Sequence, residues 1–333
     1  MSATDNILLF GELQEKRLSA ITKELLTAGR KLADEAKWQL GILFVGNELS
    51  EDAFDEPIAY GADTIYVLNH PALSEYHPEV YLYALEKTCR NLQPDILLLG
   101  QTAVGRDLAP RLAFRLRTRL VTDCVDFSLD NHSLVCVKPV YGGKAYASFV
   151  SSARPQIATV RAKSFPTDSF VASRKGDVVH LSLSFDSLKI KIEVVSRVID
   201  KSAGKNLETA SVIVCGGRGI GSAQNFTLLE ELAALLDGAV AASRPPCDLG
   251  WVSSDFQVGM TGEIVTPALY IAVGISGSSA HLAGCSNAKN IIAINKDPEA
   301  NIFRVANYGI VADYKQVLPV VIEACKKSKT QKY

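Results

Sequence analysis

The chain has 333 residues, 47% hydrophobic and 21% charged, and its 35 basic and 36 acidic side chains leave a formal net charge of −1. A single hydrophobic core stops growing below this length, so we expect two domains. The ordinary composition excludes the disordered and fibrous classes. The balanced charge gives no global field for attracting nucleic acid or an acidic membrane, so neither is an expected partner.

The seven cysteines are scattered, with no CxxC pair and no Cys/His spacing typical of zinc. Reduced thiols and no metal site are therefore expected. The opening MSATDN carries an acid and runs directly into an apolar segment, which is not typical of a signal or transit peptide. No apolar run approaches the ~20 residues that cross a bilayer. We expect a cytoplasmic protein, most naturally a bacterial one, without stable membrane insertion.

The first third of the chain alternates short apolar runs with longer charged segments. The apolar runs span residues 7–10, 40–46, 64–69 and 95–100. The segments between them, such as residues 18–37 and 79–91, have the length and charge of helices. This alternation predicts a parallel sheet covered by helices, as in a Rossmann-like domain.

An arginine-rich segment, GRDLAPRLAFRLRTR at residues 105–119, follows the fourth apolar run. Helical spacing places Leu108, Leu112 and Leu116 on one face, with arginines around it. A phosphate-binding role and a solvated or subunit-contacting face are both compatible with this pattern, and the second is favoured.

Residues 124–163 change to a period of two, with YGGK as a turn, which predicts an antiparallel extension of the first domain. Further alternating runs at residues 178–185 and 190–198 are followed by a charged, glycine-containing stretch. We therefore expect an N-terminal α/β domain with subunit contacts over residues 1–200, a linker over 201–209 and a second Rossmann-like domain over 210–333.

The second domain begins with a β-branched run, residues 211–215, that enters GGRGIG and precedes the helix-like residues 225–236. A strand, glycine loop and helix in this order point backbone amides at a phosphate. The glycines do not follow GxGxxG, and no acidic residue ends a second strand where a ribose would need it. A standard NAD site is therefore disfavoured.

Two more apolar runs end in polar loops. Residues 269–273 enter GISGSSAH, and residues 290–294 enter NKDP. Ligands of open α/β sheets bind beyond the carboxyl ends of the strands, so these loops and the neighbouring ASRP and QVGMTG segments predict one nucleotide-cofactor site. The apolar face of residues 315–327 predicts a final helix that closes the domain.

These residues also carry a family resemblance. GGRG, ASRP, QVGMTG, YIAVGISG, HLAG, AINKDPEA and YGIVAD resemble, in this order, the FAD-binding domain of the electron-transfer flavoprotein alpha subunit. GRDLAPRLAFRL and RPQIATVR resemble the first domain of that family, so the likeness covers nearly the whole chain. The resemblance implies an FAD-binding electron carrier that forms a heterodimer with a beta subunit.

The resemblance implies roles for particular residues in FAD binding. Arg218 would lie near the phosphates, Ser243 and Arg244 would face the isoalloxazine ring, and the Thr261 hydroxyl would lie near flavin N5. The rest of the implied cofactor-binding set is Val258, Gly259, Met260, Ser276, Gly277, Ser278, Ser279, Ala280, His281, Asn295, Asp313 and Tyr314. Arg244, Thr261 and His281 would tune the flavin, because a guanidinium is always cationic and a histidine can become so.

Met260 and Ala280 depart from the family's usual QVGQTG and ISGAIQH, so two amide side chains are absent. A thioether or a methyl group cannot replace an amide as a hydrogen-bonding group, so the flavin potential is expected to differ.

The resemblance implies a carrier between a flavin dehydrogenase, such as an acyl-CoA dehydrogenase, and a downstream acceptor, rather than a stand-alone enzyme. Participation in a bifurcating complex stays open. The alternatives are a nonredox nucleotide-binding assembly subunit, which Met260 and Ala280 keep open, and, less favoured, an NAD-dependent dehydrogenase.

Overall fold

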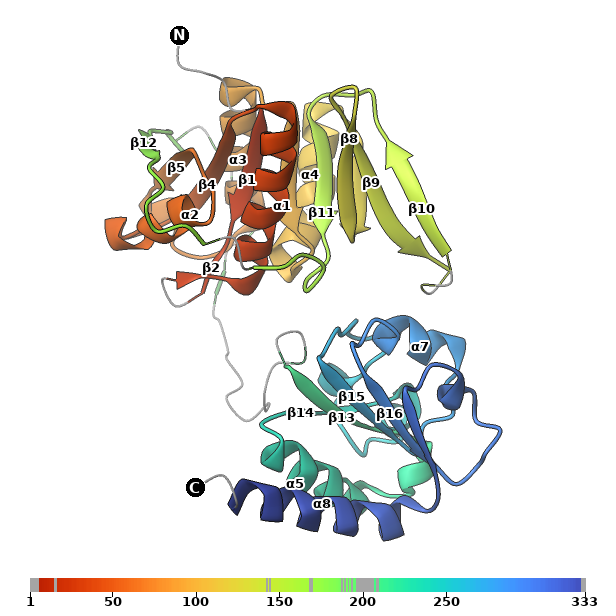
Figure 1. Cartoon of the computed structure of the whole chain (residues 1–333). Helices are drawn as coiled ribbons and strands as arrows, with labels where there is room; N and C mark the ends of the chain where they lie inside the picture. The colour runs from red at the N-terminus through yellow and green to blue at the C-terminus, as the bar shows by residue number, and fades with distance from the viewer. Residues whose placement is uncertain are drawn as a thin grey trace. The chain divides into compact units, whose positions relative to one another are not determined.

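The computed structural model describes residues 6–14, 17–141, 143, 145–167, 170–186, 188, 190, 192, 194–195, 207 and 210–330. The chain divides into two compact units, one of residues 1–140 and 146–197 and the other of residues 141–145 and 198–333 (Figure 1). Of the expected linker at residues 201–209, all but residue 207 lies outside the described residues. The proposed domain boundaries therefore stay predictions.

A seven-stranded sheet forms the centre of the first unit, in the order β12-β5-β4-β1-β6-β11-β7. Every neighbouring pair in it is parallel. The strands are β1 (Ile7–Gly11), β4 (Leu40–Gly46), β5 (Thr64–Asn69), β6 (Ile96–Gly100), β7 (Leu120–Cys124), β11 (Gln156–Val160) and β12 (Asp177–Leu181). The expected parallel sheet is thus confirmed.

Helices cover both faces of this sheet (Figure 1). They are α1 (Ala20–Ala36), α2 (Asp55–Ala59), α3 (Pro78–Leu92) and α4 (Ala103–Leu116). Successive side chains of a strand point to opposite faces. Accordingly Ile7 and Leu9 pack in a core with α1, whereas Leu8 and Phe10 pack in a second core with α3 and α4. Burial on both faces explains the nearly continuous apolar runs.

The predicted antiparallel extension is present only over residues 126–150, because β11, which lies in the same predicted range, joins the parallel sheet between β6 and β7. It contains β8 (Asp126–Asp130), β9 (Ser133–Val140) and β10 (Ala145–Val150), in the order β10-β9-β8, and β8 and β9 pair antiparallel. Gly142 and Lys144 of the predicted YGGK turn lie outside the described residues. A short hairpin of β2 (Leu13–Gln14) and β3 (Arg17–Leu18) completes the strands described for this unit.

The second unit has a five-stranded parallel sheet in the order β14-β13-β15-β16-β17. Its strands are β13 (Val212–Gly216), β14 (Ala239–Ala242), β15 (Leu269–Val273), β16 (Ile291–Asn295) and β17 (Tyr308–Val311). In chain order this arrangement is 2-1-3-4-5, so the strand order reverses between β13 and β15. A doubly wound sheet binds ligands at this switch point, beyond the carboxyl ends of the strands.

The two faces of the second sheet are covered differently. Helices α5 (Thr227–Leu235) and α8 (Tyr314–Thr330) pack against one face, with Leu229, Leu232 and Leu318 in their core (Figure 1). Helix α7 (Ser279–Cys285) and the turn that contains Val258 pack on the other face. The short helix α6 (Arg244–Asp248) follows β14. Among the described residues, no helix is both long and apolar enough to span a membrane.

The loop after β13 differs from the simple strand, glycine loop and helix that the sequence predicts. Two 3₁₀ turns, Arg218–Ile220 and Ala223–Phe226, lie between β13 and α5. A Cβ atom on Gly217 would lie 2.2 Å from the carbonyl oxygen of Gly274. The Gly217 φ of −101° is open to any residue, so backbone conformation does not require glycine here. The close approach of the two loops does require it.

Gly217→Ala should destabilise the second unit by about 2–3 kcal/mol, because the added methyl group meets backbone atoms that cannot move aside. The fluorescence of Trp251 in a Trp38→Phe background would follow unfolding of this unit alone. The control is Gly250→Asn, where φ is +71° and an added Cβ atom would have no neighbour within 4 Å. Equal stability of the Gly217→Ala variant and the parent chain would contradict the close-approach explanation.

Candidate functional site

A cavity of about 870 Å³ lies in the second unit, at the carboxyl ends of β13, β15 and β16. Its volume falls within the roughly 300–1,000 Å³ typical of small-molecule sites. The predicted residues that line it are Arg218, Ser243, Arg244, Val258, Gly259, Met260, Thr261, Ser276, Ser278, Ala280, His281 and Asn295. Loops that are far apart in the sequence thus meet at one edge of the sheet, as the switch point requires.

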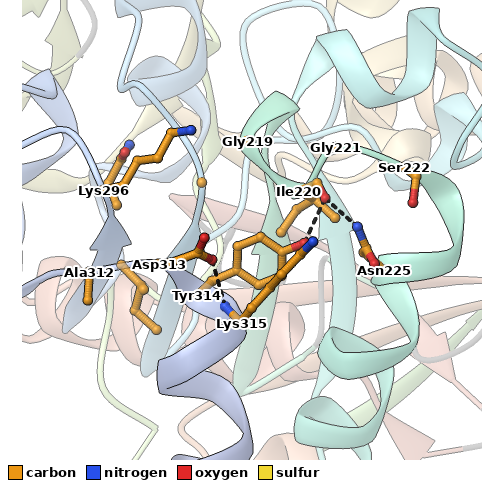
Figure 2. Close-up of a pocket in the computed structure, with 13 residues that line it drawn as sticks. Gly219, Ile220, Gly221, Ser222, Asn225, Lys296, Ala312, Asp313, Tyr314 and Lys315 are labelled. Atoms are coloured by element: carbon orange, nitrogen blue, oxygen red, sulfur yellow. Dashed lines mark hydrogen bonds between the residues drawn. The ribbon is translucent and has the colours of Figure 1, made fainter.

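A second cavity of about 330 Å³ lies along the same edge (Figure 2). The predicted residues Asn295, Asp313 and Tyr314 line it. The two cavities share four lining residues, which are Gly219, Gly274, Asn295 and Lys296. An elongated ligand could therefore contact both cavities across this shared wall.

Four amides of the glycine loop after β13 are already hydrogen-bonded within the protein. The Gly217 amide donates to the Val273 carbonyl at 2.8 Å, and the Gly219 amide donates to the Gly274 carbonyl at 3.0 Å. The amides of Ile220 and Gly221 donate within the loop itself. The expectation that the loop points its amides at a phosphate is therefore wrong for these four, because two of them hold the loop after β15 and two close the turn.

The loop after β15 supplies donors instead. Within the described part of the chain, the amides of residues 276–280 have no hydrogen-bond acceptor. Gly277 has a φ of +80°, which turns the chain here, and a Cβ atom on it would lie 2.2 Å from the Ile302 nitrogen. Successive unpaired amides in such a turn suit a bound anion. This loop is therefore the stronger candidate for a phosphate site.

The QVGMTG turn forms one wall of the larger cavity. The Thr261 hydroxyl accepts a 2.9 Å hydrogen bond from the side-chain amide of Gln257, which leaves the hydroxyl hydrogen available to a ligand. The Met260 amide donates to the Ala280 carbonyl at 2.7 Å. The two positions that depart from the family's usual pattern are therefore direct neighbours on the cavity wall. The Met260 side chain is exposed.

His281 is buried, and both of its ring nitrogens have partners. Nδ1 lies 3.0 Å from the Val258 carbonyl oxygen, and Nε2 lies 3.0 Å from the Tyr270 hydroxyl. Burial lowers the pKa of His281 to about 4, although the hydrogen bond to Val258 opposes this shift. The ring is therefore neutral at neutral pH, and the tuning role of His281 stays a prediction.

The cationic side of the cavity comes from Arg218 and Arg244. Arg244 forms an ion pair with Asp248 one helical turn away, at 3.1 Å, and both side chains are exposed. Ser243 precedes α6 and is buried, but its hydroxyl does not cap that helix. Ser243 directly follows β14, where a NAD site would need an acidic residue.

Residues of the smaller cavity connect its loops (Figure 2). The Tyr314 hydroxyl and the Asn225 side-chain amide both donate to the Ile220 carbonyl, at 2.7 and 2.8 Å. The Asn295 side-chain amide donates to the Ile275 carbonyl at 2.9 Å, while its oxygen accepts from the Asp297 amide. Asn295 and Tyr314 therefore position loops as well as line the cavity.

Two predicted residues, Gly277 and Ser279, line neither of these cavities. Sequence reasoning also missed lining residues, including the polar Gln257, Lys296 and Asp297. Gln257 begins QVGMTG, and the other two belong to NKDP, so the motifs did contain the signal. The side chains within each motif that face the cavity could only be assigned from the fold.

The fold and the site define a doubly wound α/β domain with a ligand-sized cavity at its switch point. Residues 7–186 match the family model described as the electron transfer flavoprotein domain. Residues 206–286 match the model described as the electron transfer flavoprotein FAD-binding domain. The second match covers the glycine loop, QVGMTG and the loop after β15.

Curated relatives match the chain over nearly its whole length. The electron transfer flavoprotein subunit alpha of Thermoanaerobacterium thermosaccharolyticum is 40% identical over 331 residues, covering 99% of this chain and 100% of the relative. The Bacillus subtilis protein of the same name is 39% identical, covering 96% and 97%. Protein FixB of Azorhizobium caulinodans is 38% identical, covering 97% and 89%. The chain belongs to the electron transfer flavoprotein alpha-subunit family, and FAD is its cofactor.

The lowered pKa of His281 predicts a pH-dependent stability. An unfolded histidine titrates near 6.5, so the unfolded chain binds more protons between about pH 6.5 and pH 4, and stability falls as the pH falls through this window. Between pH 7.5 and pH 5 the parent chain should lose about 2 kcal/mol more unfolding free energy than His281→Gln. Denaturant unfolding followed through Trp251 would measure this difference, and parallel pH profiles would contradict the burial of a neutral ring.

Proposed function

We propose that the chain holds FAD along the carboxyl edge of the second sheet, with the flavin in the larger cavity and the adenosine portion in the smaller one. The observation that carries this proposal is the pair of cavities with a shared wall, at the switch point of the sheet. FAD is elongated and has two ring systems joined by a pyrophosphate. A site with two compartments and a polar connection matches this chemistry.

The residues present fit FAD in their charge and donor types. Two of the four residues of the shared wall are glycines, Gly219 and Gly274, so part of this wall is bare backbone. Lys296 brings a cation to the same wall, and Arg218 adds one in the larger cavity. The unpaired amides of residues 276–280 add neutral donors for phosphate oxygens.

The residues around the larger cavity would bind and tune the flavin. A bound flavin supplies one-electron and two-electron redox chemistry, and the protein contributes position, electrostatics and shielding. Thr261 has a hydroxyl hydrogen to donate because its oxygen already accepts from Gln257. Arg244 supplies a permanent positive charge, which favours negative charge on a reduced ring. His281 contributes a neutral, fixed ring rather than a cation.

We further propose that the chain works as an electron carrier in a heterodimer with a beta subunit. Two of the relatives cited here are named as subunit alpha of an electron transfer flavoprotein, which supports a partner subunit. The carrier would take electrons from a flavin dehydrogenase and pass them to a downstream acceptor.

FAD binding by the full chain, co-expressed with a beta subunit of this family, tests the proposal directly. We expect a yellow complex with FAD in the proposed site and a flavin absorbance spectrum that dithionite bleaches. Lys296→Gln should raise the FAD dissociation constant about threefold to tenfold, because it removes a charge-assisted contact worth ~1 kcal/mol.

Lys289→Gln is the matched control, since Lys289 is an exposed lysine of the same unit that lines neither cavity. Equal FAD affinity of the two variants would contradict the placement of the phosphates at the shared wall. A colourless complex that free FAD does not reconstitute would instead favour a nonredox assembly subunit.

Arg244→Ala should lower the reduction potential of the bound flavin, because a cation beside the ring stabilises its reduced, more negative form. Asp248→Asn is the companion variant, since it removes the carboxylate that pairs with Arg244. It should leave the potential unchanged or raise it. Redox titration of both FAD-loaded variants measures these shifts. An unchanged potential in Arg244→Ala would exclude the tuning role of this residue.

A further inference from the structure

A buried tyrosine lies beneath the larger cavity, on β15. Tyr270 is fully buried, and its hydroxyl lies 3.0 Å from Nε2 of His281. Cys215 on β13 and Cys285 on α7 belong to the same buried cluster as Tyr270. The hydroxyl is therefore a polar group inside an apolar core, and such a group requires a partner.

The partners of His281 decide which ring nitrogen carries the hydrogen. The Val258 carbonyl oxygen can only accept, so Nδ1 of His281 must donate to it. In the neutral ring, Nε2 then has a lone pair and accepts the hydrogen of the Tyr270 hydroxyl. Both ring nitrogens have a hydrogen-bond partner in this arrangement. In the opposite tautomer, the lone pair of Nδ1 would face the Val258 carbonyl oxygen, and no hydrogen bond could form there.

The bond from His281 also holds the cavity wall. It ties α7 to Val258, and the Met260 amide ties the same turn to Ala280. Thr261 follows directly in this turn. The sheet thus holds the histidine through Tyr270, and the histidine holds the turn.

We propose that Tyr270 is a positioning residue whose hydroxyl donates to Nε2 of His281 and anchors this ring to the sheet, and that His281, set as the Nδ1–H tautomer by the Val258 carbonyl, thereby holds the Thr261 turn in place against the cofactor. The benefit to the cofactor rests on the proposed function. The order of hydrogen bonds does not rest on the proposed function, because it follows from the protein groups alone.

The surroundings of the pair contain neutral groups that titrate only at high pH. Burial raises the pKa of Tyr270 and of the Cys215 thiol, and raises the pKa of Cys285 to about 12. All three groups are neutral at pH 7 and provide no negative charge that would stabilise an imidazolium. Loss of the tyrosine hydroxyl would leave the Nε2 lone pair without a partner in this core, and the ring would lose its anchor to the sheet.

The test is a two-bond ¹H–¹⁵N spectrum of the full chain labelled at histidine, recorded between pH 4.5 and pH 8. The chain has five histidines, and His281→Gln identifies the signal of interest. We expect the parent chain to show the Nδ1–H tautomer down to about pH 5. Tyr270→Phe, which keeps the ring, should shift the Nε2 resonance of His281, because the Nε2 lone pair loses the hydrogen bond from the hydroxyl.

Tyr81→Phe is the matched control, because it removes a tyrosine hydroxyl that donates at 3.1 Å to the Leu73 carbonyl in the first unit. It should leave the His281 signals unchanged. An Nε2–H tautomer in the parent chain would overturn the proposal, and this result needs no variant that folds. An unchanged Nε2 resonance of His281 in folded Tyr270→Phe would overturn it as well.

FAD-loaded protein provides a second readout. In Tyr270→Phe the FAD dissociation constant should rise about threefold to tenfold relative to the parent protein, because the Thr261 turn loses its anchor to the sheet. An unchanged dissociation constant would contradict a link between this chain of hydrogen bonds and the cofactor. If the parent chain shows the Nδ1–H tautomer but binds no FAD, the proposed function fails while the role of Tyr270 in holding His281 stands.

Discussion

The site depends on the close approach of two loops at the switch point of the second sheet. The backbone of Gly217 and Gly219 contacts Gly274 so closely that no side chain fits between them. Two hydrogen bonds, from the Gly217 and Gly219 amides, hold this contact. With the first loop fixed against the second, the amides of residues 276–280 have no acceptor among the described residues, and Ser276, Ser278 and Ala280 line the cavity. The glycines therefore build the site without being its main donors.

A second constraint is the satisfaction of buried polar groups behind the cavity. The chain Val258, His281 and Tyr270 links the QVGMTG turn to the sheet through two 3.0 Å hydrogen bonds. Buried polar groups that are fully paired specify one arrangement, because any other leaves a costly unpaired atom. The long cationic side chains of the cavity, such as Arg244 and Lys296, can then stay near its exposed rim.

Much of this organisation could be predicted from the sequence. Apolar runs bounded by polar loops identified β1, β4, β5, β6, β13, β15 and β16, and a family resemblance identified most of the cavity residues. The hydrogen-bond acceptors of the backbone amides could not be predicted, because GGRGIG is typical of a phosphate-binding loop until the position of Gly274 is known. The neutral state of His281 also depends on burial and on Tyr270, which is eleven residues away in the sequence.

Hydrogen exchange of the full chain, with and without FAD, tests the central claim most directly. Without FAD, the Gly217 and Gly219 amides should exchange slowly and those of residues 276–280 quickly, because only the first pair is hydrogen-bonded. Addition of FAD should slow exchange at residues 276–280 and change little at Gly217 and Gly219. Protection that appears in the glycine loop while residues 276–280 stay unaffected would contradict the account.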